Sequence, residues 1–158
     1  MPAPRDLGLV GLVAGVVFLL DQLTKTWIVF TLAPRTPPRI DLLGRWLALE
    51  YTENRGVAFG LLGGVGPLVV LAPLLVFVIL AGLYLRTASP PVWQSFGVGL
   101  LAGGAIGNLT DRMRLGYVVD FVSVGRWPNF NVADSAITVG AIILIAGWML
   151  IDGARTDG

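Results

Sequence analysis

Two aspartates in this chain have the residue type and the surroundings that acid–base chemistry requires. Asp120 lies in the segment Val118–Phe121 and Asp134 in the segment Asn131–Ser135, each at the end of a long apolar run. A carboxylate at the centre of a membrane helix costs about 2.5–3.5 kcal/mol, and less towards the interface. A chain that retains two such groups is expected to use them, and the pair indicates acid–base chemistry on water.

The residue types that are missing narrow the chemistry further. The chain contains no histidine and no cysteine. This excludes a Ser-His-Asp triad, a cysteine nucleophile and a zinc site with the usual ligands. A serine–lysine dyad would need Ser135 and Lys25, but Asp21 lies one helical turn from this single lysine and should keep it charged. Two carboxyls that share one proton can activate water and protonate a leaving amide, so an aspartyl peptidase is predicted.

Composition predicts a membrane protein. Of the 158 residues, 55% are hydrophobic and 13% are charged, and the mean hydropathy is +0.79. One soluble core cannot hide that much apolar surface, and runs of about twenty apolar residues indicate membrane spans. The net charge of +1 and the absence of a Lys/Arg block argue against a nucleic-acid partner.

The predicted fold is an all-α membrane protein with a small β element, in one domain over residues 1–158. Four transmembrane helices are expected at about 7–32, 66–85, 92–109 and 132–151. Small residues predict close packing of the third and fourth helices; they are Gly99, Gly103, Gly107, Ala136, Gly140 and Gly147.

The long connection at about 33–64 is predicted to be an extramembrane β region. Its successive prolines exclude a helix at its start. The segment Arg45–Thr52 is rich in aromatic and apolar residues with partial alternation, which is typical of a strand. We expect a small sheet at the membrane surface, with the strand beneath the site and the Glu53–Gly60 loop folded over the top of it.

Antiparallel spans would bring polar residues from all four helices to one side of the membrane. A cluster of that kind is how a site is built within a helical bundle. Its members are Asp21, Lys25, Glu53, Asn54, Arg55, Asn108, Asp111, Arg112, Asp120, Asn131 and Asp134.

Several of these residues also have a purely structural interpretation. Asp21 and Lys25 could form an ion pair within one helix. Asn131 could be the N-cap of the fourth helix, with Asp134 as its N3 carboxylate. Asp111 and Arg112 could be a pair that closes the third helix. Asp120 has no comparable helical role.

Five motifs, in order from the first span to the last, resemble those of the lipoprotein signal peptidase family, signal peptidase II. They are Asp21–Lys25, Asn54–Gly60, Gly103–Arg112, Gly116–Phe121 and Phe130–Ser135. The resemblance implies a membrane-embedded aspartyl endopeptidase that removes signal peptides from bacterial prolipoproteins. It cuts before a cysteine that carries diacylglyceryl, and it needs no metal; we expect no other cofactor.

Carried over to this chain, the resemblance implies that Asp120 and Asp134 are the catalytic pair. The residues that it implies shape the site or position the substrate are Asp21, Lys25, Asn54, Gly56, Asn108, Asp111, Arg112, Asn131 and Ala133. We expect a monomer in contact with membrane lipids, in the cytoplasmic membrane, with the site on its extracytoplasmic face.

Two features depart from the family pattern. The segment between Asp120 and Asp134 is shorter than the family leads us to expect. The positive-inside rule alone would place the site in the cytoplasm, because most arginines lie on the site's side of the membrane. Those arginines are Arg35, Arg39, Arg45, Arg55, Arg112, Arg114 and Arg126.

Two other classes of function remain as alternatives. A small four-span transporter would use Asp120 and Asp134 as a proton relay, with carboxylates near the middle of the spans. A noncatalytic lipid-binding scaffold would tolerate Asn at either position.

Overall fold

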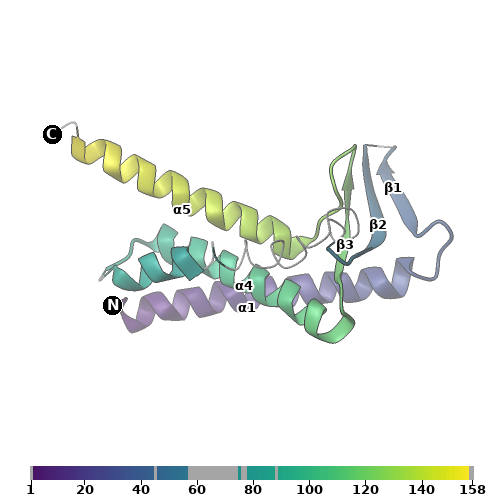
Figure 1. Cartoon of the computed structure of the whole chain (residues 1–158), viewed down its shortest axis with the longest axis horizontal. Helices are drawn as coiled ribbons and strands as arrows, with labels where there is room; N and C mark the ends of the chain where they lie inside the picture. The colour runs from purple at the N-terminus through teal and green to yellow at the C-terminus, as the bar shows by residue number, and fades with distance from the viewer. Residues whose placement is uncertain (1, 45, 57–74, 76–77, 88, 157–158) are drawn as a thin grey trace.

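The computed structural model describes residues 2–44, 46–56, 75, 78–87 and 89–156 (Figure 1). Its elements, in chain order, are α1 (Pro4–Leu32), β1 (Arg39–Leu43), β2 (Leu47–Asn54), α4 (Val92–Leu115), β3 (Val118–Val124) and α5 (Val132–Thr156). Residues 78–86 are also helical. The fold is therefore mostly helical with a small β element, as predicted.

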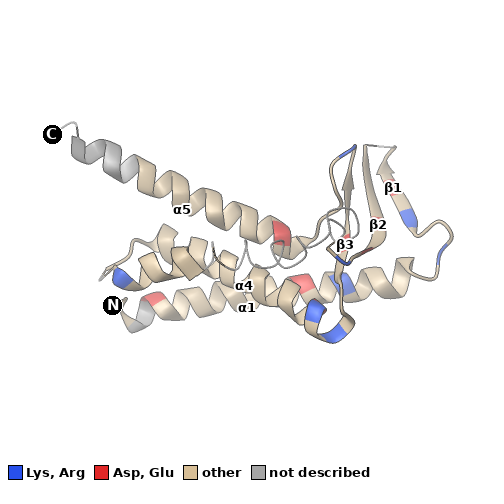
Figure 2. Cartoon of the chain, viewed as in Figure 1, with Lys and Arg blue, Asp and Glu red and all other residues tan. Residues whose placement is uncertain are grey.

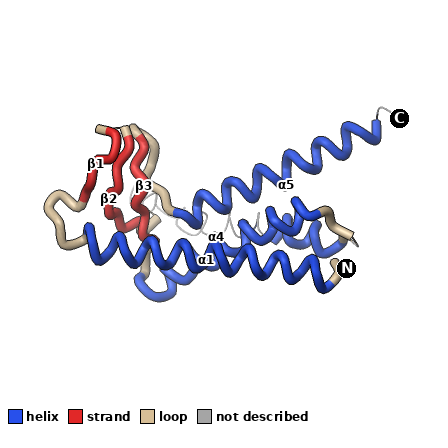
Figure 3. The backbone as a smooth tube through the Cα atoms, turned by 180° about the vertical axis from the view of Figure 1, so that it is seen from behind, coloured by secondary structure: helices blue, strands red, loops and turns tan. Residues whose placement is uncertain are grey.

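The helices and the sheet occupy different parts of the molecule. Helix α4 packs against both α1 and α5, and the three strands lie at one end of these helices (Figure 1). The view from behind shows the same division, with the start of α1 and the end of α5 far from the sheet (Figure 3).

Small residues let the helices approach closely, as the sequence predicted. A Cβ added at Gly103 on α4 would lie 2.6 Å from the backbone oxygen of Ala14 on α1. A Cβ added at Gly140 on α5 would lie 2.7 Å from the backbone oxygen of Gly97 on α4. Both distances are shorter than a real contact, so a larger residue would push the helices apart.

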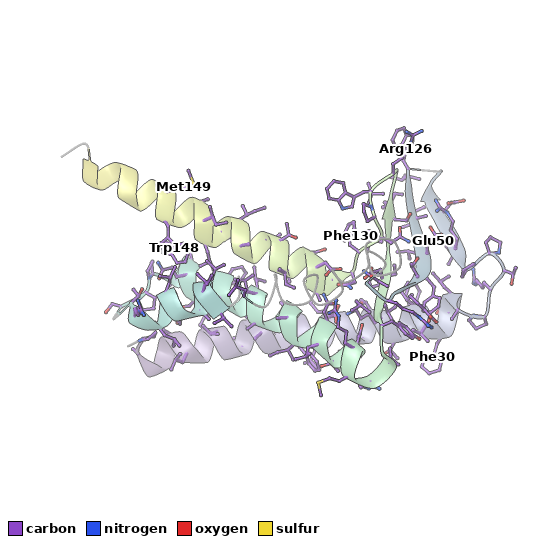
Figure 4. All side chains as sticks on the ribbon, viewed as in Figure 1. Phe30, Glu50, Arg126, Phe130, Trp148 and Met149 are labelled. Carbon is purple, nitrogen blue, oxygen red and sulfur yellow. The ribbon has the colours of Figure 1, made fainter. Side chains whose placement is uncertain are left out.

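Large apolar side chains cover the outside of the helices. Phe30 on α1 and Met149 on α5 point away from the bundle (Figure 4), and they are 79% and 71% exposed. Within the described residues, two helical segments are long and apolar enough to cross a membrane, Asp6–Leu32 and Val132–Met149. These two agree with the first and the last predicted spans.

The other two predicted spans have different outcomes. The third corresponds to α4, whose polar residues and glycines make it less apolar than the first and last helices. Of the second, at 66–85, only residues 75 and 78–85 lie within the described part of the chain, and these are helical. The number of spans therefore stays a prediction.

The predicted helix ends need correction. Asp111 and Arg112 do not close α4, because the carboxylate of Asp111 is buried with partners and the helix continues to Leu115. Gly116 ends α4 instead, with a left-handed φ of 81° that glycine adopts without strain. Helix α5 likewise continues to Thr156, beyond the predicted end at residue 151.

The sheet is antiparallel in the order β1-β2-β3. The strand predicted at Arg45–Thr52 corresponds to β2, shifted towards Asn54, and residue 45 is not described. Strands β1 and β3 were not predicted. In the β2–β3 register Thr52 lies opposite Asp120, so the sheet carries one of the two aspartates.

Apolar side chains attach the sheet to the helices. Ile28 and Leu32, at the end of α1, form a buried cluster with Val119 and Phe121 of β3. Strand β3 alternates its side chains between two faces. Val119 and Phe121 on one face therefore hold β3 against α1, and Asp120 between them points to the other face.

Candidate active site

Charged residues gather where the helices meet the sheet. Figure 2 shows acidic and basic positions on α1, α4 and α5 close to the sheet end, with few along the middle of the helices. This distribution agrees with the predicted one-sided site. It differs from the mid-span carboxylates that a proton relay would require.

Asp120 lies on β3 and is almost fully buried, with 2% of its surface exposed. Its Oδ1 accepts a hydrogen bond from the Nδ2 of Asn131, and its Oδ2 accepts one from the Nδ2 of Asn54, both at 2.8 Å. Burial raises the pKa of Asp120 to about 6; the bond from Asn54 opposes this rise, and the nearby charge of Asp134 adds to it. Asp120 can therefore hold a proton close to neutral pH.

Asp134 is the third residue of α5 and takes part in the cap of that helix. The Oδ1 of Asn131 accepts the backbone N–H of Asp134 at 2.9 Å, and the Oδ2 of Asp134 accepts the backbone N–H of Asn131 at 3.3 Å. The N-cap interpretation of these residues is thus confirmed. It does not exclude chemistry, because the Oδ1 of Asp134 also accepts a 2.7 Å bond from the Nδ2 of Asn108.

Asn131 brings the two aspartates together. Its Nδ2 donates to Asp120, while its backbone N–H and its Oδ1 bind Asp134. Asn131 is itself fully buried, so these contacts are sheltered from water. One residue at the start of α5 therefore holds the carboxyl from the strand beside the carboxyl from the helix.

Lys25 lies in a buried ion cluster next to this pair. Its Nζ is 2.8 Å from Asp21 Oδ2 and 2.9 Å from Asp111 Oδ2, and each of these side chains is at most 5% exposed. The predicted ion pair within α1 is confirmed, but it extends to α4. Removing one member would leave a buried charge unpaired, which costs about 3–5 kcal/mol.

The same cluster connects the helices to the start of α5 and to β3. Asp21 Oδ1 accepts the backbone N–H of Ala133 at 3.0 Å, and Asp111 Oδ2 accepts the backbone N–H of Val119 at 3.1 Å. Ala133 and Val119 are neighbours of the two aspartates along the chain. The cluster therefore fixes the backbone on which both aspartates are mounted.

Sequence reasoning did not single out Gln22. Its Nε2 donates to Asp21 at 3.1 Å and to Asp111 at 3.0 Å, so it bridges the two carboxylates that flank Lys25. The available signal was its position inside the Asp21–Lys25 motif.

The structure does not bring Ser135 and Lys25 together as a dyad. The Oγ of Ser135 donates to the backbone oxygen of Asn131 at 2.9 Å. The ammonium of Lys25 has Asp21, Asp111 and Asn108 as acceptors, which matches its three protons.

Asn54 reaches the site from the end of β2. Gly56 has a positive φ of 71°, and its backbone N–H donates to the Oδ1 of Asn54 at 2.8 Å. This turn directs the other end of the amide, Nδ2, to Asp120. The expected closure of the Glu53–Gly60 loop involves residues 57–60, which lie outside the described residues.

Arg112 and the short β3–α5 connection form the edge of the site. Arg112 donates from Nη1 to the backbone oxygen of Asn108 at 3.3 Å. In the connection, the Nδ2 of Asn129 donates to the Oγ1 of Thr52 at 2.8 Å, a contact that the sequence did not predict. Figure 4 shows Phe130 at the junction of β3 and α5, where its backbone pairs with Val122. This connection is thus held directly against the sheet.

Known proteins show the same sequence pattern along most of the chain. The family model described as signal peptidase (SPase) II matches residues 13–150. A protein of Syntrophomonas wolfei subsp. wolfei named lipoprotein signal peptidase is 41% identical over 141 residues, which cover 89% of this chain and 92% of that protein. A protein of the same name from Rhodococcus jostii is 40% identical over 152 residues, covering 92% and 74%.

The fold is also similar to solved structures. One, described as a bacterial membrane enzyme, superposes with a TM-score of 0.75 at 29% identity and covers 89% of this chain and 92% of its own. A second structure with the same description has the same score and covers 94% of this chain.

Proposed function

This chain belongs to the signal peptidase II family, and we propose that it is an aspartyl endopeptidase with Asp120 and Asp134 as its catalytic pair. Its substrates are prolipoproteins whose signal peptide is cut before a diacylglyceryl-modified cysteine. The observation that carries the proposal is the contact of Asn131 with both carboxyls.

The two carboxyls have surroundings that suit different steps. Asp134 lies in the first turn of α5, where the backbone N–H groups stabilise a negative charge. Asp120, with a pKa of about 6, is the better holder of the shared proton. Asp134 takes a proton from water as the water oxygen attacks the scissile carbonyl carbon. Asp120 donates its proton to the carbonyl oxygen.

The tetrahedral intermediate then collapses and the carbon–nitrogen bond breaks. The proton that Asp134 took from water passes to the leaving nitrogen. The carbonyl forms again as its hydroxyl proton returns to the pair, so the pair ends the cycle with one proton. No metal or other cofactor enters this scheme, in keeping with the family resemblance.

The position of the pair suits a substrate that is anchored in lipid. The acyl chains of the modified cysteine stay in the bilayer, so the scissile bond lies at the membrane surface. Asp120 lies on β3 and Asp134 in the first turn of α5, and Figure 1 shows β3 and the start of α5 together at one end of the helices. The proposal includes four spans, a monomer surrounded by membrane lipids, and a site on the extracytoplasmic face of the cytoplasmic membrane.

The proposed orientation follows the family resemblance and not the simple count of arginines, several of which take part in ion pairs. Arg39 pairs with Asp41 at 2.7 Å and with Glu50 at 2.8 Å. A second pair joins Arg55 and Glu53 at 2.7 Å. These arginines are therefore tied into folded structure at the sheet end of the molecule.

A cleavage assay with a pair of matched peptides tests the proposal. The purified protein, in lipid, is given one prolipoprotein peptide with diacylglyceryl on its cysteine and the same peptide without it. We expect cleavage before the modified cysteine and little cleavage of the unmodified peptide. Equal rates on both peptides would contradict the proposed substrate, and the absence of cleavage in both would contradict the proposed activity.

A further inference from the structure

Three asparagine amides hold the two aspartates, and the oxygen of each amide faces a group that can only donate. An amide has a donor end and an acceptor end, so a fixed donor at its oxygen determines where its NH₂ points. The Oδ1 of Asn54 accepts from the backbone N–H of Gly56 at 2.8 Å, and the Oδ1 of Asn131 accepts from the backbone N–H of Asp134 at 2.9 Å. The Oδ1 of Asn108 accepts from the ammonium of Lys25 at 2.9 Å.

The Asn108 amide differs from the other two because a side chain fixes it. Asn108 Oδ1 accepts from Lys25, and it also accepts from the Nδ2 of Asn131 at 3.2 Å. Asn108 Nδ2 donates to the Oδ1 of Asp134 at 2.7 Å. A flipped amide would place its NH₂ against an ammonium and its oxygen against a carboxylate, so the flip is unfavourable at both ends.

The ammonium of Lys25 is fixed in position by two ion pairs. Asp21 and Asp111 bind the ammonium at 2.8 and 2.9 Å, and the residue is 3% exposed. Two carboxylates hold the ammonium in a fixed position. Among the described residues Lys25 makes no hydrogen bond or ion pair with either catalytic carboxyl. Apart from the long-range effect of its charge, it is linked to Asp134 through the amide of Asn108.

We propose that Lys25 is a positioning residue that orients the Asn108 amide, so that this amide donates to Asp134 and keeps it the proton acceptor of the pair. The inference rests on the proposed aspartyl mechanism. The charged groups around Asn108 are Lys25 and Asp21 from α1, Asp111 and Arg112 from α4, Asp120 from β3 and Asp134 from α5.

Asn108→Asp tests the donor end of the amide. The new carboxylate keeps an acceptor for Lys25 but places an oxygen where the donor to Asp134 was. We expect kcat to fall by about 10²- to 10³-fold, as for loss of one preorganised donor, with KM nearly unchanged. In a plot of rate against pH, the acidic limb, where the rate rises with pH, should move to higher pH by about one unit or more. The reason is that a like charge now faces Asp134.

A second variant removes the ammonium without changing the net charge of the cluster. Wild type has two carboxylates and one ammonium there, and Lys25→Met with Asp111→Asn leaves one carboxylate, so both carry a charge of −1. The double variant should lower kcat and move the acidic limb in the same direction. Asp111→Asn alone retains Lys25 and is the control; because it removes one negative charge, its acidic limb should not move to higher pH.

Melting temperature, measured on each variant, separates positioning from structural support. If both test variants keep the wild-type acidic limb and lose rate only as they lose folded protein, Lys25 is structural and the inference is wrong. If wild type itself shows no two-limbed profile, the aspartyl mechanism fails instead. If Lys25→Met with Asp111→Asn does not fold, Asn108→Asp can still overturn the inference, because an unmoved acidic limb in that variant would mean that the amide does not control Asp134.

Discussion

Helix α4 contacts its neighbours in two different ways along its length. In its first half, Gly97 packs against Leu144 of α5, where an added Cβ would lie 2.9 Å from the leucine side chain. In its second half, buried Asn108 and Asp111 make directed polar contacts with Lys25 and Asp134. Close packing of side chains stabilises the first region, and directed hydrogen bonds and ion pairs stabilise the second.

The difference separates stability from chemistry. Apolar packing depends on volume and has no preferred proton state. A buried polar network fixes which atom donates and which accepts, and a half-satisfied network is costly. Changes in the apolar half should therefore alter the melting temperature, and changes in the polar half should alter the dependence of rate on pH.

The largest effect should come from the polar half, at the catalytic pair itself. Asp120→Asn and Asp134→Asn preserve volume but remove the exchangeable proton, so each should lower kcat by at least about 10²- to 10⁴-fold. Turnover is measured on the lipidated peptide, with the melting temperature and membrane insertion as controls for folding. Near-wild-type cleavage by either variant would rule out the aspartyl mechanism.

Gly103→Val should show the opposite behaviour. An added Cβ at this position meets Ala14 O at 2.6 Å and Val17 Cβ at 2.7 Å. Overpacking of this kind costs about 1–3 kcal/mol of folding stability, so the melting temperature should fall. The pH dependence of the rate should stay as in wild type for the protein that remains folded. Gly8→Val is the control, because an added Cβ there has no described atom within 4 Å. A shift of the pH–rate profile in Gly103→Val would contradict the claim that this region affects stability alone.

Gly56→Val should have the smallest effect on stability and a selective effect on rate. Valine at a φ of 71° is strained, at about 1–2 kcal/mol, and this turn directs the Asn54 amide to Asp120. We expect turnover to fall more than the melting temperature. Gly44→Val has a similar strain, at a φ of 51°, and no neighbour within 4 Å. Equal losses of rate in the two variants would mean that Gly56 only forms a turn.

Much of the helical region could be predicted from the sequence because its signals are local. Apolar runs mark α1 and α5, and the spacing of Gly99, Gly103 and Gly107 marks a packing face of α4. The end of α4 was misjudged at Asp111, because a charged residue normally indicates the surface. Here the partner that buries it, Lys25, lies 86 positions earlier in the chain.

The sequence allowed us to predict which residues form the site, but not which of their atoms contact one another. Asp120 and Asp134 stand out because acids beside apolar runs are costly. Strand β3, which carries Asp120, could not be predicted, because its pairing with Thr52 is long-range and its length is only seven residues. Residue types likewise do not show which end of the Asn108 amide faces Lys25; only the folded arrangement of α1, α4 and α5 determines that.

The central claim is that Asp120 and Asp134 share one proton, and the pH dependence of kcat/KM on the lipidated peptide tests it most directly. The acidic limb reports protonation of the carboxylate that activates water, and the basic limb reports loss of the shared proton. Burial, with the Asp134 charge adding to it, raises the pKa of Asp120 to about 6, so the rate should fall as the pH rises beyond that region. A rate that continues to rise far into the alkaline range would contradict the claim and would indicate Lys25 as the base.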